Sequence, residues 1–328
     1  MPPSFLKEGV IMAKIKEMIN KKNAAPKMLS GKARRGIEQL NYWIMCIPAL
    51  LWLLFFHIIP MSGIWISFVD YKPKKGIFGS EFVGMQNFKY LFSMNDFTSV
   101  IGNTFIIAIG KVVLNLLVPL VFALLLNEIK NAKYKKFVQT VVYLPHFISW
   151  VILASIISKI FGYNGIINAV GALFGKEAQI YFSNSTVFRY FVILSDVWKE
   201  CGFNSIIYLA ALTGINPELY EAAALDGANR WQSLIHITIP SIKSTIVLLG
   251  TLAMGNVLNA GFDQVFNLYN PLVYSTGDII DTWVYRFGLI NMNYSIGTCA
   301  GLFKSLVSLV LIVVSYILAY KFADYTIF

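Results

Sequence analysis

Residue types that perform catalysis or bind metals are present in this sequence, but their spacing matches no such site. The three histidines, His57, His146 and His236, are far apart and form no HExxH or comparable motif. Residues 171–176, GALFGK, are similar to a phosphate-binding loop but have one residue too few and lack the final Ser or Thr. The sequence therefore predicts no catalytic residue, no metal site and no ATP site on this chain.

Polar side chains inside long apolar segments are better candidates for a function. Ionisable and amide groups at membrane depth are costly, and they are functional candidates for that reason. Aromatic rings beside them can stack on the flat faces of a solute while the amides bind its hydroxyls. The candidates for a solute path are Trp198, Asn204, Tyr208, Asn256, Asn259 and Phe262. The alternative is hydrogen bonding between helices, with an ion pair from Lys199 to Asp196 or to Glu200.

Two further polar residues, Lys111 and Asn115, are four positions apart and would share one helix face. They are expected to face the interior of a helix bundle rather than lipid. Packing between helices is the favoured interpretation for this pair.

The composition places these residues in a polytopic membrane protein. The chain has 328 residues, of which 57% are hydrophobic and only 13% are charged. A soluble domain would expose too much apolar surface with this composition. The net charge of +10 is also compatible with nucleic acid as a partner, but nine of the basic residues precede Tyr42. A basic segment ahead of a first membrane span is typical of the positive-inside rule, so no nucleic acid is expected.

Six transmembrane helices are expected, because a span needs about 20 largely apolar residues. They are predicted at 42–66, 98–126, 137–161, 187–212, 241–260 and 296–320. The lysine-rich loop 127–136 should be cytoplasmic, and six crossings then place both the N- and C-termini in the cytoplasm. The fold class is all-α. The domains are a basic cytoplasmic segment (1–41), a first transmembrane helix with an external segment (42–97), and a core of five transmembrane helices (98–328).

A polar, alanine-rich stretch, residues 216–240, separates two of the apolar segments. Its Asn-Pro start and the acidic residues that follow predict the beginning of a helix. Gly227 should end this helix, and a second short helix should run over 228–236 before Pro240. Small side chains let a partner's surface approach the backbone, whereas a helix lying on lipid headgroups is the alternative. The residues expected to make the contact are Glu221, Ala222, Ala223, Asp226, Gly227, Ala228 and Pro240.

The spacing within this stretch resembles a known signature. The run EAA at 221–223, three residues, Gly227, nine residues and ITIP at 237–240 resemble the EAA signature of permease subunits from binding-protein-dependent ABC importers. The usual leucine before the proline is Ile239 here. From about Trp43 onward the chain also resembles the carbohydrate permeases of the lipoprotein and polysaccharide branch. That resemblance is carried by IPMSGIWISFVDY (59–71), ALLLNEIKNAKYKKFVQTVVYLPHFISWV (123–151) and VWKECGFNSIIYLAALTGINPELYEAAALDGANRW (197–231).

The resemblance implies the MetI-like permease fold of a type I ABC importer in a bacterial inner membrane. Two dissimilar permease subunits would surround a central path, and an extracytoplasmic binding protein would deliver an oligosaccharide. Two ATPase subunits would bind ATP and Mg²⁺, so this chain would need no cofactor. Residues 216–236 would be the coupling helix, docked in a groove of the ATPase, and would drive alternating access.

Two other functions remain as alternatives. A membrane enzyme is disfavoured because no catalytic constellation is visible. An ion-coupled secondary sugar carrier would usually show internal repeats and a carboxylate in mid-span, and no repeat is apparent. The sugar itself is not identified by the sequence, although the branch favours a complex or uronic-acid oligosaccharide.

Overall fold

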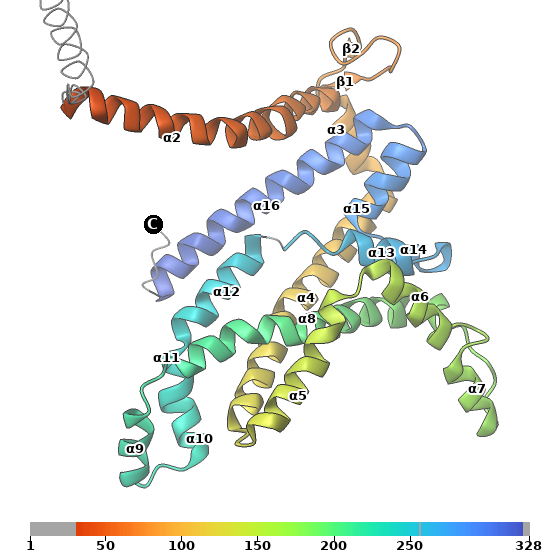
Figure 1. Ribbon diagram of the computed structural model, residues 1–328. Helices are drawn as coiled ribbons and strands as arrows, with labels where there is room; N and C mark the ends of the chain where they lie inside the picture. Colours follow the sequence, from red (N-terminus) through yellow and green to blue (C-terminus); the bar gives the residue numbers. More distant parts are fainter. Residues whose placement is uncertain (1–30, 256, 324–328) are drawn as a thin grey trace, which may run out of the picture. The chain divides into compact units, whose positions relative to one another are not determined.

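The computed structural model describes residues 31–255 and 257–323, and these residues are mostly helical. The chain divides into two compact units, Met1–Ser62 and Gly63–Phe328. Most of the predicted basic segment, residues 1–30, lies outside the described residues, as does the path candidate Asn256. Figure 1 shows the order of the elements along the chain.

The described part of the first unit is one long helical segment. Helix α2 (Gly31–Leu53) contains Pro48 and continues through a π-helical turn, η1 (Leu54–Ile58), into the 3-10 segment η2 (Ile59–Phe68), which crosses into the second unit. The candidate membrane span Tyr42–Phe68 has no buried residue in its most apolar window. Its length and hydropathy fit the first predicted transmembrane helix.

Two long helices form the centre of the second unit. Helix α4 (Asn95–Glu128) packs along α8 (Ser185–Thr213), and α12 (Lys243–Gly255) packs against α16 (Tyr294–Ala323). The largest core cluster includes Ile107, Phe188, Val192, Leu258 and Val265. This core contains side chains of α4, α8 and the segment after α12. It therefore determines which polar residues of these elements come into contact.

Shorter elements connect and cover this centre. The two strands β1 (Val69–Asp70) and β2 (Glu81–Phe82) pair antiparallel, Val69 opposite Phe82. The short helices outside the coupling region are α3 (Gln86–Ser93), α5 (Ala132–Tyr143), η3 (Leu144–Phe147), α6 (Trp150–Phe161), α7 (Ile166–Leu173), η4 (Tyr181–Ser183), α13 (Phe262–Leu268), η6 (Pro271–Val273), α14 (Tyr274–Gly277), α15 (Ile280–Trp283) and η7 (Val284–Ile290). Most of these short helices lie between the predicted transmembrane helices.

The described helices are consistent with the predicted six membrane spans, although length and apolarity alone do not identify all of them. Among the described residues, four helical segments are long and apolar enough to cross a membrane, or five with the bent pair Arg230–Ser241 and Lys243–Gly255. Helix α8 has 29 residues, which is long enough to cross a membrane. It is not among the four apolar segments because it contains four charged residues. The predicted third span, 137–161, is broken at 144–149, where Pro145 interrupts the helix. The apolar segment there is Trp150–Leu173 instead.

Candidate functional site: the coupling element and the interior polar network

The stretch 216–241 folds as two helical arms joined by a tight turn, and we call it the coupling element after the role that the resemblance to the EAA signature implies. Its first arm is α9 (Glu218–Leu225). The Asn216 side chain accepts a hydrogen bond from the backbone N–H of Glu218 at 3.1 Å. Asn216 thus satisfies one free N–H of the first turn as predicted, although the helix begins at Glu218 and Pro217 occupies the cap position. The two acidic residues of the first turn, Glu218 and Glu221, complement the positive end of the helix dipole.

Gly227 ends the first arm in a left-handed conformation, with φ +79°. The Ala228 N–H donates to the Ala223 carbonyl at 2.9 Å, and the Gly227 N–H donates to the Ala224 carbonyl at 3.1 Å. This pair of bonds is the Schellman motif, which favours glycine at the left-handed position. The predicted break at Gly227 is confirmed, and the backbone bonds give the turn a defined shape.

The second arm, Arg230–Ser241, is longer than predicted. It comprises α10 (Arg230–Ser233), the π-helical turn η5 (Leu234–Thr238) and α11 (Ile239–Ser241). Asn229 and Gln232 form a capping box at its start, with bonds of 2.8 and 2.9 Å. Pro240 lies near the end of this arm, directly after the π-helical turn, and a 59° bend to α12 follows.

One side-chain bond ties the two arms together. The Tyr220 hydroxyl lies 2.9 Å from the Thr238 hydroxyl. Neither residue was singled out from the sequence, because a tyrosine and a threonine eighteen positions apart give no periodic signal.

We expect Tyr220→Phe to reduce the free energy of unfolding by about 0.5–1.5 kcal/mol, the net value of one hydrogen bond. Denaturant unfolding in detergent would measure this loss. Tyr134→Phe is the matched control, because Tyr134 is an exposed tyrosine of α5. Equal midpoints for the two variants would contradict a role for the bond between the arms.

The outer surface of the coupling element is left uncovered by residues 31–255 and 257–323. Glu221, Ala222, Asp226 and Pro240 are exposed, and Ala223 and Ala228 are half-buried. At the tip, Leu225 is 89% exposed, which is unusual for a leucine in a helix that ends in a well-formed cap. A rigid helical arm with small side chains and an uncovered leucine has the form of a docking surface.

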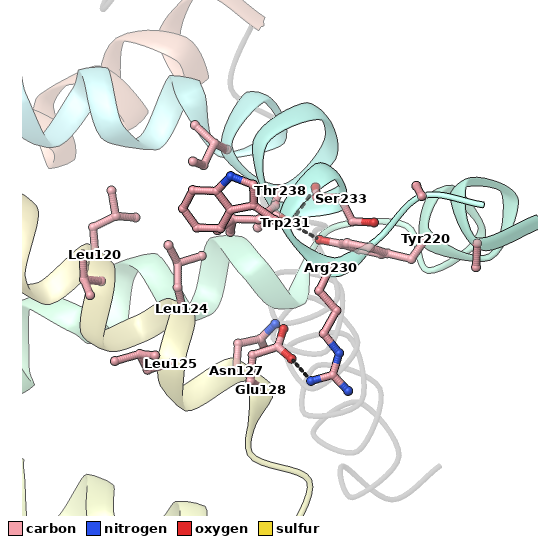
Figure 2. Close-up of a pocket in the computed structure, with 15 residues that line it drawn as sticks. Leu120, Leu124, Leu125, Asn127, Glu128, Tyr220, Arg230, Trp231, Ser233 and Thr238 are labelled. Carbon is pink, nitrogen blue, oxygen red and sulfur yellow. Dashed lines mark hydrogen bonds and ion pairs between the residues drawn. The ribbon is translucent and has the colours of Figure 1, made fainter. Parts of the chain in front are cut away.

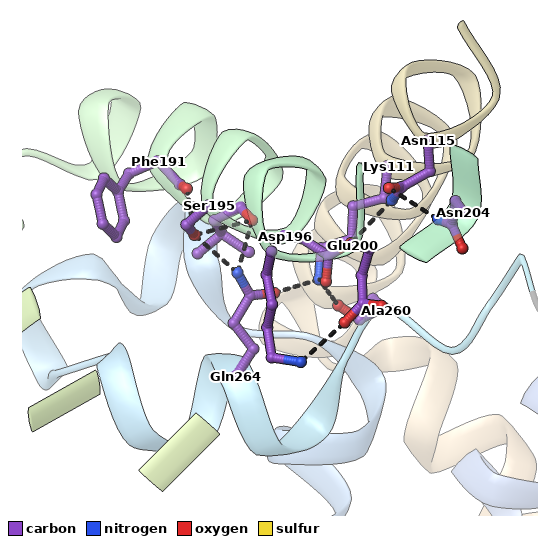
Figure 3. Close-up of polar contacts among 11 residues, drawn as sticks. Lys111, Asn115, Phe191, Ser195, Asp196, Glu200, Asn204, Ala260 and Gln264 are labelled. Atoms are coloured by element: carbon purple, nitrogen blue, oxygen red, sulfur yellow. Dashed lines mark hydrogen bonds and ion pairs between the residues drawn. The ribbon is translucent and has the colours of Figure 1, made fainter. Parts of the chain in front are cut away.

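A second group of polar residues lies inside the second unit (Figure 3). Lys111 of α4 lies 3.1 Å from the Asp196 carboxylate of α8, donates to the Ala260 carbonyl at 2.7 Å and also donates to the Gln264 side chain. Asn115 donates to Asp196 at 2.9 Å. Gln264 in turn donates to the Val192 carbonyl at 2.7 Å. These bonds join α4, α8 and α13, so Lys111 and Asn115 do face the interior as predicted.

A third group surrounds the break between α5 and α6. Lys199 lies 2.9 Å from Glu200 and donates to the His146 carbonyl at 2.9 Å, and the His146 ring lies 2.6 Å from Glu200. The His146 ring also stacks on Phe203 at 3.9 Å. Of the two ion pairs considered for Lys199, the structure forms the one with Glu200.

The described path candidates lie in different sets of contacts. Trp198 is exposed, and Asn204 is half-buried with a long 3.5 Å contact to Asn115. Asn259 accepts a hydrogen bond from Lys304 at 2.9 Å, and Phe262 stacks on Phe266 at 5.2 Å. Tyr208 is buried in the core and donates to the Leu116 carbonyl at 3.3 Å. Its hydroxyl is therefore engaged in helix packing in this structure.

Two ion pairs of the structure were not predicted from the sequence. Lys304 of α16 lies 2.6 Å from Asp281, and Arg286 lies 2.5 Å from Asp278 and over the ring of Tyr274. Burial raises the pKa of Asp278, although hydrogen bonds from Thr282 and Arg286 act in the opposite direction. Lys304 could have been found, because a lysine inside an apolar helix is itself a signal.

Comparison with known proteins shows the family. Residues 120–324 match the family described as "Binding-protein-dependent transport system inner membrane component". The chain is 42% identical over 289 residues to the "Polygalacturonan/rhamnogalacturonan transport system permease protein YteP" of Bacillus subtilis (strain 168), covering 88% of this chain and 90% of that protein. This chain therefore belongs to the inner-membrane components of binding-protein-dependent transport systems and is a membrane transport subunit.

Two solved structures show the same fold. One is a bacterial ABC transporter involved in the import of the acidic polysaccharide alginate, with a TM-score of 0.82 and 35% identity, covering 89% of this chain and 99% of that one. The other is a bacterial alginate ABC transporter in complex with an alginate pentasaccharide-bound periplasmic protein, with a TM-score of 0.80 and 36% identity over 88% of this chain and 96% of that one. The expected all-α permease fold is confirmed by this likeness.

Proposed function

We propose that this chain is a permease subunit of an ATP-driven importer and that its coupling element transmits the motion of a cytoplasmic ATPase. The supporting observation is the coupling element itself: a capped helix with an exposed face, ended by Gly227 and tied by Tyr220 to the arm that leads into α12. A short helix fixed at both ends moves as a lever rather than deforming. Force applied at α9 then reaches α12, which packs on α16.

The proposed assembly contains a second, dissimilar permease, two ATPase subunits that bind ATP and Mg²⁺, and an extracytoplasmic binding protein. Both termini and the coupling element would lie in the cytoplasm, beside the lysines of 127–136. Changing the population ratio of the inward- and outward-facing states from 1:99 to 99:1 takes about 5.5 kcal/mol of differential stabilisation. The contacts between the coupling element and the ATPase must therefore differ between the two states.

The proposed substrate is an acidic oligosaccharide. The relatives reported above are named for polygalacturonan and alginate transport, and both solved structures belong to alginate importers. On this chain Asn204, Asn259, Phe262 and Trp198 are the proposed sugar contacts, because amides bind hydroxyls and rings stack on sugar faces. Tyr208 is the weakest member of this set, since its hydroxyl already bonds the Leu116 carbonyl.

The test is ATPase activity of the complex reconstituted with its partner permease, ATPase and binding protein. We expect oligogalacturonate or oligoalginate, together with the binding protein, to stimulate hydrolysis several-fold, and neutral malto-oligosaccharides of equal length to have no such effect. Stimulation by the neutral sugars alone would overturn the acidic substrate while leaving the importer intact. Sugar uptake by the chain without any ATPase would instead support an ion-coupled carrier.

A further inference from the structure

A groove of about 900 Å³ lies between the C-terminal end of α4 and the second arm of the coupling element (Figure 2). This volume falls within the range of about 300–1,000 Å³ that is typical of ligand cavities. Its walls are mainly apolar side chains from both elements: Leu120, Val121, Leu124 and Leu125 of α4, and Trp231, Leu234 and Ile239 of the second arm.

The polar groups on the floor of the groove are bonded to one another. The Tyr220 hydroxyl pairs with that of Thr238, which also approaches the Ser233 carbonyl at 3.4 Å. The Ser233 hydroxyl donates to the Asn229 carbonyl at 3.2 Å. A floor whose polar groups are satisfied internally favours an apolar occupant over a polar one.

The rim of the groove carries one cation, Arg230, beside the carboxylate of Glu128. The Arg230 side chain is 85% exposed and lies 3.7 Å from Glu128, a loose pair at the surface. Four more cations follow Glu128 in the sequence, beyond the residues that line the groove: Lys130, Lys133, Lys135 and Lys136. Trp231, 68% exposed, contributes an amphipathic ring of the kind found at membrane interfaces.

We propose that this groove binds an anionic phospholipid of the cytoplasmic leaflet, with one acyl chain between α4 and the second arm and the phosphate at Arg230. The apolar walls occupy the last two turns of an apolar membrane-spanning helix, and the cations begin where that helix ends. This order matches the depth of acyl chains and headgroups in a leaflet, and cationic segments beside a membrane attract anionic lipids. The assignment to the cytoplasmic leaflet rests on the proposed function, which places the coupling element in the cytoplasm. The existence of the groove does not depend on that proposal.

The test uses phosphatidylglycerol with a photoreactive diazirine on its acyl chain, added to the chain purified with its co-expressed partner subunits. After irradiation, mass spectrometry locates the labelled residues. We expect labels on 120–125 and 231–239. Arg230→Gln should lower labelling by phosphatidylglycerol at least threefold and leave labelling by the phosphatidylcholine analogue unchanged.

A filled groove provides the second arm of the test. Val121→Trp combined with Leu125→Trp should reduce labelling at least fivefold, whereas Ile109→Trp should not. Ile109 is the matched control because it lies on the same helix outside the groove, 51% exposed against 54% for Val121. Labelling spread evenly over the apolar face of α4 would overturn the proposal. So would labelling of the chain alone that disappears when the partner subunits are bound, because the groove would then be a subunit interface.

Discussion

Replacing Lys111 with methionine is expected to lower the free energy of unfolding by about 3–5 kcal/mol. The Lys111 side chain is only 8% exposed, and it lies 3.1 Å from Asp196 while donating to the Ala260 carbonyl and to Gln264 (Figure 3). Methionine keeps the chain length but removes the charge, so Asp196 is left as a poorly compensated buried carboxylate. The Ala260 carbonyl also loses its donor. Denaturant unfolding in detergent, followed by tryptophan fluorescence, would measure the loss.

The double variant Lys111→Met with Asp196→Asn separates the charge from the packing. Removing both charges abolishes the uncompensated carboxylate, so this variant should recover a large part of the lost stability. Asn115 still has an amide oxygen to which it can donate. Lys133→Met is the control for a lysine at the surface, and it should change stability by less than about 0.5 kcal/mol. Equal unfolding midpoints for Lys111→Met and Lys133→Met would show that the interior ion pair contributes little.

This pair illustrates what the sequence predicts about the polar network and what it does not. The four-residue spacing of Lys111 and Asn115 placed both on one interior face, because helical periodicity is a local property. For Lys199 the sequence predicts an ion pair either with Asp196 or with Glu200, both on the same helix. The structure forms the pair with Glu200, and it pairs Asp196 with Lys111 of another helix. Contacts between helices depend on how α4 and α8 pack against each other. That packing cannot be predicted from the sequence of either helix alone.

The membrane spans show the same division between local and tertiary information. The spans at 42–66, 98–126 and 296–320 were predicted closely, because each is a long apolar run and hydropathy alone identifies it. The segment around Pro145 was predicted as continuous, although it breaks at 144–149. There His146 and its carbonyl are held by Glu200 and Lys199 of α8, which stabilise a broken backbone that hydropathy cannot indicate.

Gly227→Val is expected to reduce binding-protein-stimulated ATPase activity by about 5–30-fold. Gly227 has φ +79° and no atom within 4 Å of an added Cβ, so the cost of valine comes from the backbone alone. A left-handed conformation costs a residue with a side chain about 1–2 kcal/mol, and more for a β-branched one. That cost corresponds to a factor of about 5–30 in the population of the native turn. Because the turn orients α9 against the second arm, its loss should disconnect docking from α12 rather than unfold the bundle.

Gly175→Val is the matched control for this prediction. Gly175 also has a left-handed φ, +72°, with no atom within 4 Å of an added Cβ, but it follows α7 and lies outside the coupling element. Both valine variants carry the same backbone strain, so only a role in coupling distinguishes them. Gly227→Asn should retain most of the activity, since asparagine tolerates the left-handed region. If Gly175→Val and Gly227→Val lowered the stimulated ATPase rate equally, general destabilisation would explain the loss, and the coupling role of this turn would have to be abandoned.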